Sequence, residues 1–162
     1  MNQKPLLCPC GQQQQGQRTP YTHCCEPYHL GHSLANNPET LMRSRYSAFV
    51  LQQHQYLIDT HHGDYLGGLT KQVLDEQEAT QWIGLQVISS ANQQTKGSVT
   101  FQAWYLAEHG LDAIHEQSDF VFEQQRWWYT SGKQFKAVPP KRNMPCVCHS
   151  GKKFKQCCMN KG

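Results

Sequence analysis

Apolar residues recur at helical spacing in the stretch that follows the Asn-Pro-Glu sequence at 37–39. The repeat comprises Met42, Tyr46, Phe49, Val50 and Leu57. Such residues would lie along one face of a helix, and the Asn-Pro-Glu sequence supplies an N-cap, a proline for the first turn and an acid for the positive end of the helix dipole. Gly63 is a suitable end. We therefore predict one long amphipathic helix over residues 38–62 and a shorter helix within 70–80.

From Trp82 onward, apolar residues alternate with polar or small ones. One series comprises Ile83, Leu85 and Val87, and the next comprises Val99, Phe101, Ala103 and Tyr105. This period of two is typical of half-buried strands. Turns are expected at 92–97 and 108–110, followed by strands around 113–124 and over 126–130. Four strands joined by short turns predict an antiparallel meander, and the order of elements predicts an α+β fold with helices covering one face of the sheet.

The 162-residue chain divides into three regions. Residues 1–30, which we call the N-terminal knuckle, contain four cysteines and a glutamine run that predicts a solvated loop. Residues 31–135 hold the helices and strands of a middle domain. Residues 136–162 comprise the end of a linker that starts near residue 132, followed by a second cysteine cluster, the C-terminal knuckle. A chain of this length suffices for one domain with a proper core.

All eight cysteines lie in the two knuckles. They are Cys8, Cys10, Cys24 and Cys25 at the start, and Cys146, Cys148, Cys157 and Cys158 at the end. Four thiolates brought together by a short loop form a closed tetrahedral zinc site. Adjacent cysteines rarely form a disulfide, and thiols stay reduced in the cytosol. We therefore expect two structural zinc ions per chain.

Several alternatives to this zinc assignment stay open. His23 precedes Cys24 and could replace one thiolate. An empty thiol cluster and an iron–sulfur cluster also use four cysteines. Complete quartets argue against a catalytic cysteine, which needs a lone exposed thiolate, although a redox switch that releases zinc is compatible with the pattern.

The formal net charge of +3 conceals an asymmetry between the ends of the chain. Residues 1–135 carry eight Lys/Arg and twelve Asp/Glu, whereas residues 136–162 carry seven Lys/Arg and no acid. Because four thiolates and one dication leave about −2 at each zinc site, part of the basic tail balances its own metal cluster. The chain starts without the apolar run of a signal peptide and has no membrane-spanning run. We expect a soluble, cytoplasmic protein that does not associate with membranes.

The segment PCVCHSGKKFKQCC at residues 145–158 resembles the SEC-C motif, a zinc knuckle named for the C-terminus of the SecA translocase ATPase. It differs from the usual pattern at His149, where glycine is common. A residue at this turn can require positive φ, which glycine adopts more readily than histidine.

The chain as a whole resembles the YchJ family of small bacterial proteins. The resemblance rests on Leu41-Met42-Arg43-Ser44-Arg45-Tyr46-Ser47-Ala48-Phe49, Trp82-Ile83-Gly84-Leu85, His115-Glu116-Gln117-Ser118 and Trp127-Trp128-Tyr129. It implies a nuclear-transport-factor-2-like middle domain, in which helices pack into the curve of a bent sheet to form a cone, and it implies no particular activity. Two departures are the thirteen residues between Cys10 and Cys24, where the family has eight, and Asp119 in place of arginine.

The preferred functional interpretation is a cytosolic zinc-binding adaptor that is not an enzyme. Its partner-binding residues would be Lys152, Lys153, Phe154 and Lys155, which would present a basic, aromatic face. Resemblance to other SEC-C modules implies a protein partner in translation or secretion. An alternative is that the basic tail binds RNA or the ribosome.

The runner-up interpretation, ahead of RNA binding, is an enzyme or small-molecule binder that uses the pocket of the cone. The pocket candidates are Arg43, Arg45, Tyr46, His115 and Trp127, and further polar candidates are His54, Glu116 and Asp119. A structural role is the preferred interpretation of each of them. Residues two apart on a helix do not share a face, so Arg43 and Arg45 are expected to have different surroundings. Adjacent residues of a strand point to opposite faces of a sheet, so His115 and Glu116 cannot form a side-by-side pair.

Overall fold

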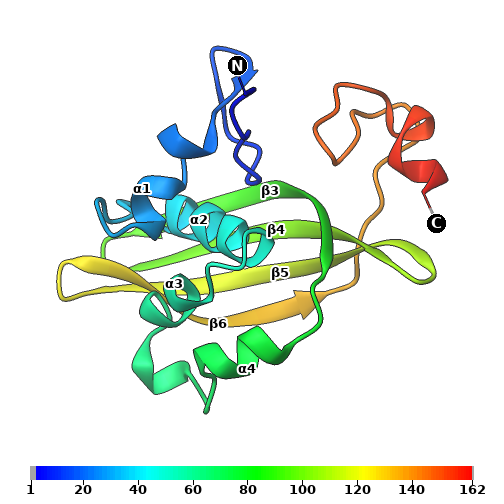
Figure 1. Ribbon diagram of the computed structural model, residues 1–162. Coiled ribbons are helices and arrows are strands. Elements are labelled where there is room, and N and C mark those ends of the chain that lie inside the picture. Colours follow the sequence, from blue (N-terminus) through cyan, green and yellow to red (C-terminus); the bar gives the residue numbers. More distant parts are fainter. Residues whose placement is uncertain (1–2, 162) are drawn as a thin grey trace.

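The computed structural model describes residues 3–161, in which helices cover one face of a four-stranded antiparallel sheet (Figure 1). This arrangement confirms the predicted α+β fold. Helix α2, Pro38–Val50, crosses the sheet and begins where predicted. The side chain of Asn37 accepts a hydrogen bond from the backbone N–H of Thr40 at 2.8 Å, which satisfies one of the free donors at the helix start.

The long helix predicted over 38–62 is wrong, because the chain turns after Val50 and resumes as α3, His54–Asp59. Gln52 takes the left-handed conformation at this turn (φ 56°). The turn brings Leu57 back against Ala48 in a small buried cluster. In a continuous helix these two residues would lie about 14 Å apart along the axis. The apolar spacing of the sequence fits both arrangements, so it could not reveal the break.

The remaining helices are short. Gly63, the predicted helix end, instead opens a 3-10 turn, η2, Gly63–Tyr65. Helix α4, Lys71–Glu76, lies within the shorter helix predicted at 70–80. Helix α1, Glu26–His29, follows the cysteines of the N-terminal knuckle and was not predicted. The glutamine run forms a small exposed hairpin of β1, Gln13–Gln14, and β2, Gln17–Arg18.

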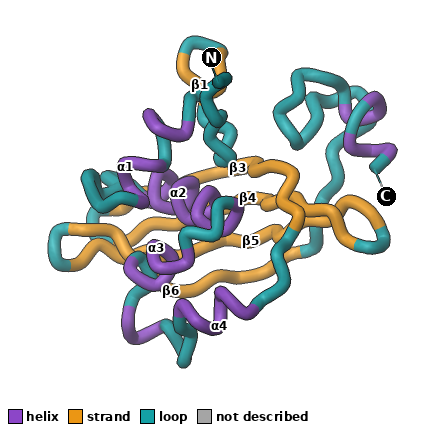
Figure 2. The backbone as a smooth tube through the Cα atoms, viewed as in Figure 1, coloured by secondary structure: helices purple, strands orange, loops and turns teal. Residues whose placement is uncertain are grey.

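The sheet is the predicted meander, with strands in the order β3-β4-β5-β6 (Figure 2). The strands are β3, Gln81–Gln93; β4, Lys96–Ala107; β5, Gly110–Glu123; and β6, Arg126–Phe135. They are longer than predicted, and the turns between them are correspondingly tighter. Strand β6 continues through residues 131–135, so its end takes in part of the predicted linker. The pairing of β3 with β4 shifts register near Ile83 and Ile88, and such bulges bend a sheet.

The two faces of the sheet bury different sets of side chains. On β4, Val99 and Ala103 belong to the main core beneath the helices. Trp104 points to the opposite face, as the alternation of a strand requires, and it is buried there against residues of the C-terminal knuckle. That knuckle contains two 3-10 turns, η3, Phe154–Gln156, and η4, Cys158–Asn160, which supply the buried residues Phe154 and Cys158. No helix in the described chain combines the length and the apolarity that crossing a bilayer requires.

Candidate metal centres

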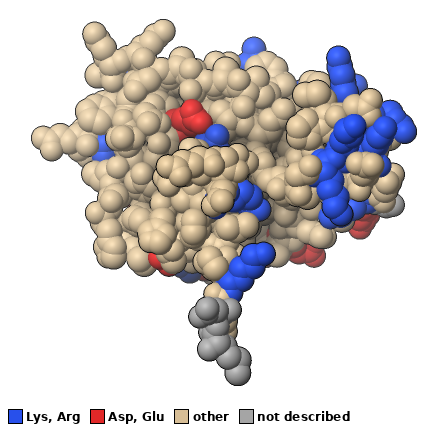
Figure 3. Space-filling model, turned by 90° about the horizontal axis from the view of Figure 1, so that it is seen from above, with Lys and Arg blue, Asp and Glu red and all other residues tan. Residues whose placement is uncertain are grey.

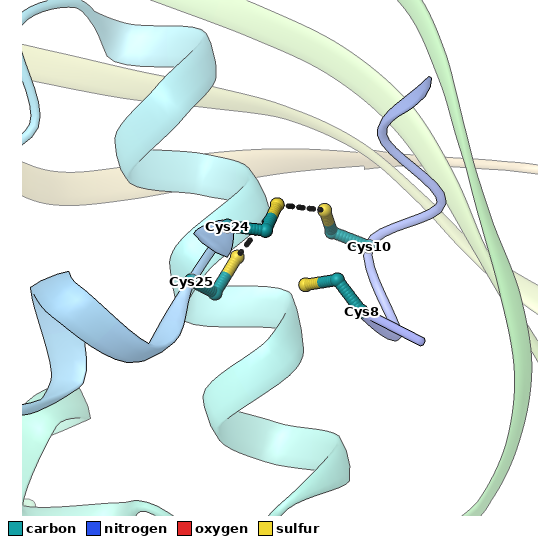
Figure 4. Close-up of side chains that lie close together, drawn as sticks. All are labelled: Cys8, Cys10, Cys24 and Cys25. Carbon is teal, nitrogen blue, oxygen red and sulfur yellow. Dashed lines mark hydrogen bonds between the residues drawn. The ribbon is translucent and has the colours of Figure 1, made fainter. Parts of the chain in front are cut away.

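The four cysteines of the N-terminal knuckle converge on one point (Figure 4). Cys8 and Cys10 come from a loop that reverses at Gly11 (φ 75°), and its Cys8 N–H donates to the carbonyl of Thr19 at 2.9 Å. Cys24 and Cys25 sit at the turn between η1, Tyr21–His23, and α1. The Sγ atom of Cys24 lies 3.6 Å from that of Cys10 and 3.9 Å from that of Cys25.

The C-terminal knuckle repeats this arrangement on a different part of the molecule. The backbone N–H of Cys146 donates to the carbonyl of Lys152 at 2.8 Å, which closes the loop between the two cysteine pairs. The Sγ atom of Cys157 lies 3.5 Å from that of Cys148 and 3.9 Å from that of Cys158. In each quartet the four Sγ atoms lie within 4.8 Å of one another. All eight cysteines are free, so neither quartet contains a disulfide.

These sulfur spacings fit a tetrahedral metal ion. With Zn–S bonds of about 2.3 Å, the edges of a sulfur tetrahedron are about 3.8 Å long. The spacings given above for Cys24 and Cys157 scatter around this value. His23 is exposed and outside the quartet, so the N-terminal site consists of four thiols and does not use the imidazole. Both quartets could therefore hold a metal ion with a closed shell of four sulfur ligands.

The thiols within each quartet differ in pKa. In the N-terminal quartet, hydrogen bonds from neighbouring thiols lower the pKa of Cys8 and Cys10, while the same bonds raise the pKa of Cys24 and Cys25. In the C-terminal quartet, burial opposes ionisation of Cys148, but hydrogen bonds from Ser150 and Cys157 outweigh it and lower its pKa to about 6. Some thiols are thus ready to ionise, and a cation would stabilise the full set of thiolates.

Each quartet has its own set of basic neighbours. At the N-terminal knuckle, Arg18 donates to the carbonyl of Cys8 at 2.9 Å, and Arg43 donates to that of Cys10 at 3.0 Å. Arg43 also pairs with Glu39 at 3.0 Å. At the C-terminal knuckle, Lys152 and Lys153 belong to the metal loop itself and are exposed.

The two knuckles meet over the edge strand β3. His149 adopts φ 60°, the left-handed conformation that its place in the turn requires. Its Nε2 donates to the carbonyl of Leu85 on β3 at 3.0 Å. A Cβ atom on Gly11 would lie 2.6 Å from the same Nε2, and one on Gly84 would lie 2.0 Å from the carbonyl oxygen of Val147. Glycine at both positions therefore permits the close packing of the knuckles, and His149 satisfies one edge carbonyl that β3 would otherwise expose.

The chain matches the family model for the YchJ middle NTF2-like domain over residues 37–132, and the SEC-C motif over residues 142–160. A UPF0225 protein of Shewanella sp. strain MR-4 is 52% identical to it across 94% of this chain and 95% of the relative. This chain belongs to the YchJ (UPF0225) family. The C-terminal quartet and the basic residues around it lie within the SEC-C match.

Other YchJ-family relatives and solved structures agree with this assignment. A UPF0225 protein of Vibrio cholerae is 37% identical across 94% of this chain and 99% of the relative. The crystal structure of a SEC-C motif-containing protein from Psychrobacter arcticus superposes with a TM-score of 0.67 at 31% identity, covering 94% of this chain and 95% of that one. The solution structure of another SEC-C motif-containing protein, from Rhodopseudomonas palustris, gives a TM-score of 0.70 at 27% identity. The match covers 81% of this chain and 100% of that one.

The structure separates the residues proposed for the pocket of the YchJ middle domain. Arg45 and Tyr46 line a cavity between α2 and the sheet, and so does Glu116. The lining of this cavity does not include Arg43, His115 or Trp127. Arg43 of α2 instead faces the N-terminal knuckle, where it donates to the carbonyl of Cys10.

His115 lies on the other face of the sheet, where its Nδ1 is 2.8 Å from the carbonyl of Lys136. Trp127 is buried in the main core. Of the further polar candidates, His54 is paired with Asp75 at 2.6 Å and Asp119 is exposed. Sequence reasoning missed His61 and Tyr129, which also line the cavity. No local pattern marks them, because they come from different elements and meet only in the fold.

The prediction for one of the proposed partner-binding residues is wrong. Phe154 was expected to be exposed beside the lysines, but it is only 7% exposed and packs with Trp104 in the core of the C-terminal knuckle. Lys152 and Lys153 are exposed as predicted, and Lys155 is half-buried. The loop thus exposes Lys152 and Lys153 and turns Phe154 inward. Phe154 therefore anchors the knuckle to the sheet and does not form part of its outer surface.

Proposed function

We propose that this protein is a two-zinc adaptor whose C-terminal knuckle docks on an acidic surface of a protein partner. The partner class that the SEC-C motif suggests is a protein of translation or secretion. The observation that carries the proposal is a closed quartet of buried and half-buried cysteines beside cations that have no acidic partner among residues 3–161. The middle domain then serves as the rigid base on which this surface is held.

Zinc is the metal that the donor set favours. Four thiolates are soft ligands that suit zinc, and a closed shell of four leaves no position for a reactive water. Loading measured by mass spectrometry on freshly reduced, purified protein should give two zinc ions per chain. One zinc ion or none, or the visible absorption of an iron–sulfur cluster, would overturn the zinc assignment.

The docking surface is the basic region of the C-terminal knuckle, on the side of the molecule where Figure 3 shows lysines and arginines gathered. Its exposed cations include Lys141, Arg142, Lys152 and Lys153. Within residues 3–161, no Lys or Arg after residue 135 forms an ion pair. Cations left unpaired on a rigid surface attract an acidic partner and orient it.

Exposed methionines favour a protein partner over RNA. Met144 is 53% exposed and Met159 is 40% exposed, and the backbone of Met144 pairs with that of Phe154, so it borders the lysine loop. Methionine adapts its shape and is common on protein-binding surfaces. RNA recognition usually adds aromatic rings on which bases stack, but the aromatic residue of this loop, Phe154, is buried.

The test compares two charge-reversal variants of the full chain. K152E/K153E/K155E removes the proposed surface, and K4E/K96E/K133E changes three exposed cations elsewhere by the same amount. Proteins captured by the wild type are purified, and their binding is measured by calorimetry. We expect the first variant to bind at least about tenfold more weakly and the second to match the wild type.

Three outcomes would contradict the docking proposal. Equal binding by both variants would mean that the knuckle is not the docking surface. Loss of the captured material on nuclease treatment, with affinity falling steeply as salt rises, would identify RNA as the ligand. Loss of zinc from the first variant would make its weaker binding a folding defect, and single reversals of Lys152 and Lys153 would then have to reproduce the effect for the proposal to stand.

A further inference from the structure

A cavity of about 290 Å³ lies between α2 and the concave face of the sheet, away from both cysteine quartets. Most of its wall is apolar, with rings supplied by Tyr46, Phe49, Trp82, Phe101 and Phe120. At about 30 Å³ for each water-sized group, the cavity has room for about ten non-hydrogen atoms. Its size and its apolar walls suit a small organic molecule.

Arg45 places a positive charge at one end of this cavity. It is 8% exposed, and its Nη1 donates to the carbonyl of Leu57 at 2.8 Å and to Oγ1 of Thr60 at 2.7 Å. Its guanidinium carbon lies 4.5 Å from the centre of the Tyr129 ring. In the described chain, no acid forms an ion pair with Arg45, and no acceptor contacts its Nε or Nη2.

The Glu116 carboxylate favours the charged form of Arg45 but forms no ion pair with it. The arrangement of Arg45 indicates what would compensate the remaining cost of burying its charge. Burial lowers the pKa of Arg45 to about 10, which still leaves it charged at neutral pH. Nη1 is committed to the protein, so Nε and Nη2 form the remaining edge of the guanidinium. Two donors side by side on this edge match the two oxygens of a carboxylate.

His61 lines the same cavity with an uncharged ring. Its ring lies edge-on to Tyr129, with 4.9 Å between ring centres, and both ring nitrogens are buried close to backbone groups of Tyr65 and Thr130, with no hydrogen bond of ordinary geometry. Burial and the charge of Arg45 lower the pKa of His61, so the ring is neutral and offers one donor and one acceptor. Buried polar groups in folded proteins nearly always have a partner. For His61 the nearby candidates are backbone groups of Tyr65 and Thr130, and its nitrogens have almost no surface open to the cavity.

Glu116 lines the same cavity, but its carboxylate is already engaged. It accepts hydrogen bonds from Ser118 at 2.7 Å and from the Tyr129 hydroxyl at 3.3 Å, and a third from Gln134. These three donors disperse its negative charge and tie it to β5 and β6. The group at the polar end that still has free donors is therefore the Arg45 cation, and this favours an anion over a cation as the ligand.

We propose that the cavity binds a small aromatic or branched carboxylic acid. Its carboxylate would accept hydrogen bonds from Nε and Nη2 of Arg45, and its apolar body would lie among the rings of Tyr46, Trp82 and Phe101. The proposal concerns binding alone. It is independent of the knuckle surface, because the two sites share no residue.

The test uses cinnamate and cinnamamide, which have the same shape and differ in charge. Binding to the zinc-loaded full chain is measured by calorimetry, and ¹⁵N-resolved shift changes locate the site. We expect cinnamate to bind at least about tenfold more tightly than cinnamamide and to shift resonances of residues that line the cavity. Equal affinities, or no binding of either compound, would overturn the proposal.

Two variants assign the binding to the cavity. Arg45→Lys keeps the charge but loses the paired donors, and we expect it to weaken cinnamate about tenfold and to leave cinnamamide unchanged. Since Arg45 also supports α3, its variant could fail to fold. Ile114→Phe fills the cavity without touching that support, and it should abolish binding of both compounds. Ile88→Phe, at a site that is 50% exposed, is the matched control and should bind as the wild type does.

A last control excludes attraction to the basic tail. K152E/K153E/K155E should bind cinnamate with unchanged affinity, because these lysines are remote from the cavity lining. If this variant loses cinnamate while Ile114→Phe retains it, the anion binds the knuckle surface and the cavity proposal fails. That result would leave the docking proposal intact, so the two proposals can fail separately.

Discussion

The two knuckles hold their sulfur atoms at nearly the same spacings, yet they join the rest of the molecule in different ways. Three cysteines of the N-terminal quartet belong to the main core, where they pack with Leu41 and Met42 of α2. Two cysteines of the C-terminal quartet form a separate small core with Trp104 and Phe154 on the opposite face of the sheet. The same ligand set thus supports the central fold at one end and a peripheral platform at the other.

The basic residues around the two quartets also differ in how they are placed. Arg18 of the N-terminal knuckle and Arg43 of α2 donate to backbone carbonyls of the first metal loop. Lys152 and Lys153 of the C-terminal knuckle face solvent. A cation that is committed to its own loop cannot be offered to a partner. The comparison therefore favours a structural role for the first quartet and supports the presenting role proposed for the second.

The largest expected effect comes from removing one ligand of either quartet. Cys10→Ser and Cys158→Ser change two cysteines that are both 0% exposed. Structural zinc contributes about 10–16 kcal/mol of binding free energy in zinc-finger peptides. We expect Cys10→Ser to lower the global free energy of unfolding by several kcal/mol, and Cys158→Ser to loosen the C-terminal knuckle while the sheet stays folded.

Hydrogen exchange combined with zinc analysis checks this pair of substitutions. Each variant should retain one zinc ion per chain. Amides of β4 and β5 should lose protection in Cys10→Ser and keep it in Cys158→Ser. If both variants lose protection across the sheet to the same extent, the two quartets support the fold equally and the comparison is wrong.

The features that could be predicted from the sequence are those that short stretches of sequence determine. Cysteine spacing and sulfur chemistry indicated both quartets, and a period of two indicated the strands of the meander. The different attachment of the quartets depends on contacts between distant residues. Phe154 is surrounded by lysines in the sequence, and its burial follows from Trp104, which lies fifty positions earlier.

The cavity illustrates the same limit. Arg45 and Tyr46 could be proposed because they lie in a helix of recognisable pattern. His61 and Tyr129 are joined by an isolated bridge between a loop and β6, which no periodicity reveals. The break after Val50 was missed for a related reason, since Leu57 fits the helical repeat whether or not the chain turns before it.

A substitution of intermediate effect tests whether the knuckles are coupled at their contact. Gly11→Ala should destabilise the protein by about 1–3 kcal/mol, because its φ is positive and its new Cβ would collide with His149. His149→Gly removes the ring and the hydrogen bond to Leu85, at a cost of about 0.5–1.5 kcal/mol, while easing the left-handed turn. In the double variant the collision is absent, so the two effects should not add.

Urea unfolding of the four proteins of this cycle gives the coupling energy. We expect the double variant to be more stable, by at least about 0.5 kcal/mol, than the sum of the two single effects predicts. The zinc content should stay at two per chain. Strict additivity would show that the knuckles fold independently across the edge of β3, and the contrast between them would then be one of position alone.

A smaller effect distinguishes the inward from the outward cations. Arg43→Gln should lower the free energy of unfolding by about 1–2 kcal/mol, because it breaks the hydrogen bonds to Cys10 and Glu39. Lys153→Gln, at an exposed site, should change it by less than about 0.5 kcal/mol but should weaken partner binding. Thermal unfolding and calorimetry measure the two quantities. The reverse result, with Lys153 supporting stability and Arg43 supporting binding, would invert the assigned roles.

The smallest expected effect is a pH dependence located at the N-terminal knuckle. His29 of α1 links this knuckle to α2: its Nε2 donates to the carbonyl of Ser44 at 2.7 Å, and its Nδ1 accepts from the Tyr21 hydroxyl at 2.7 Å. Burial lowers the pKa of His29, although Glu26 and Cys8 nearby favour its protonated form. Because the folded pKa lies below the unfolded value of about 6.5, the unfolded chain binds more protons below that pH. Stability contributed by neutral His29 is therefore present above about pH 6.5 and is lost as the pH falls.

This dependence is measured as a difference between the wild type and His29→Gln, whose side chain does not titrate. The free energy of unfolding is followed from about pH 7.5 to about pH 6, a range that spans the ordinary pKa of histidine, and only samples that retain two zinc ions per chain are compared. The wild type should lose stability relative to His29→Gln as the pH falls. Parallel curves would show that His29 does not contribute to the attachment. The N-terminal knuckle would then depend on its metal and its apolar contacts alone, which would bring it closer to the C-terminal knuckle than the present comparison places it.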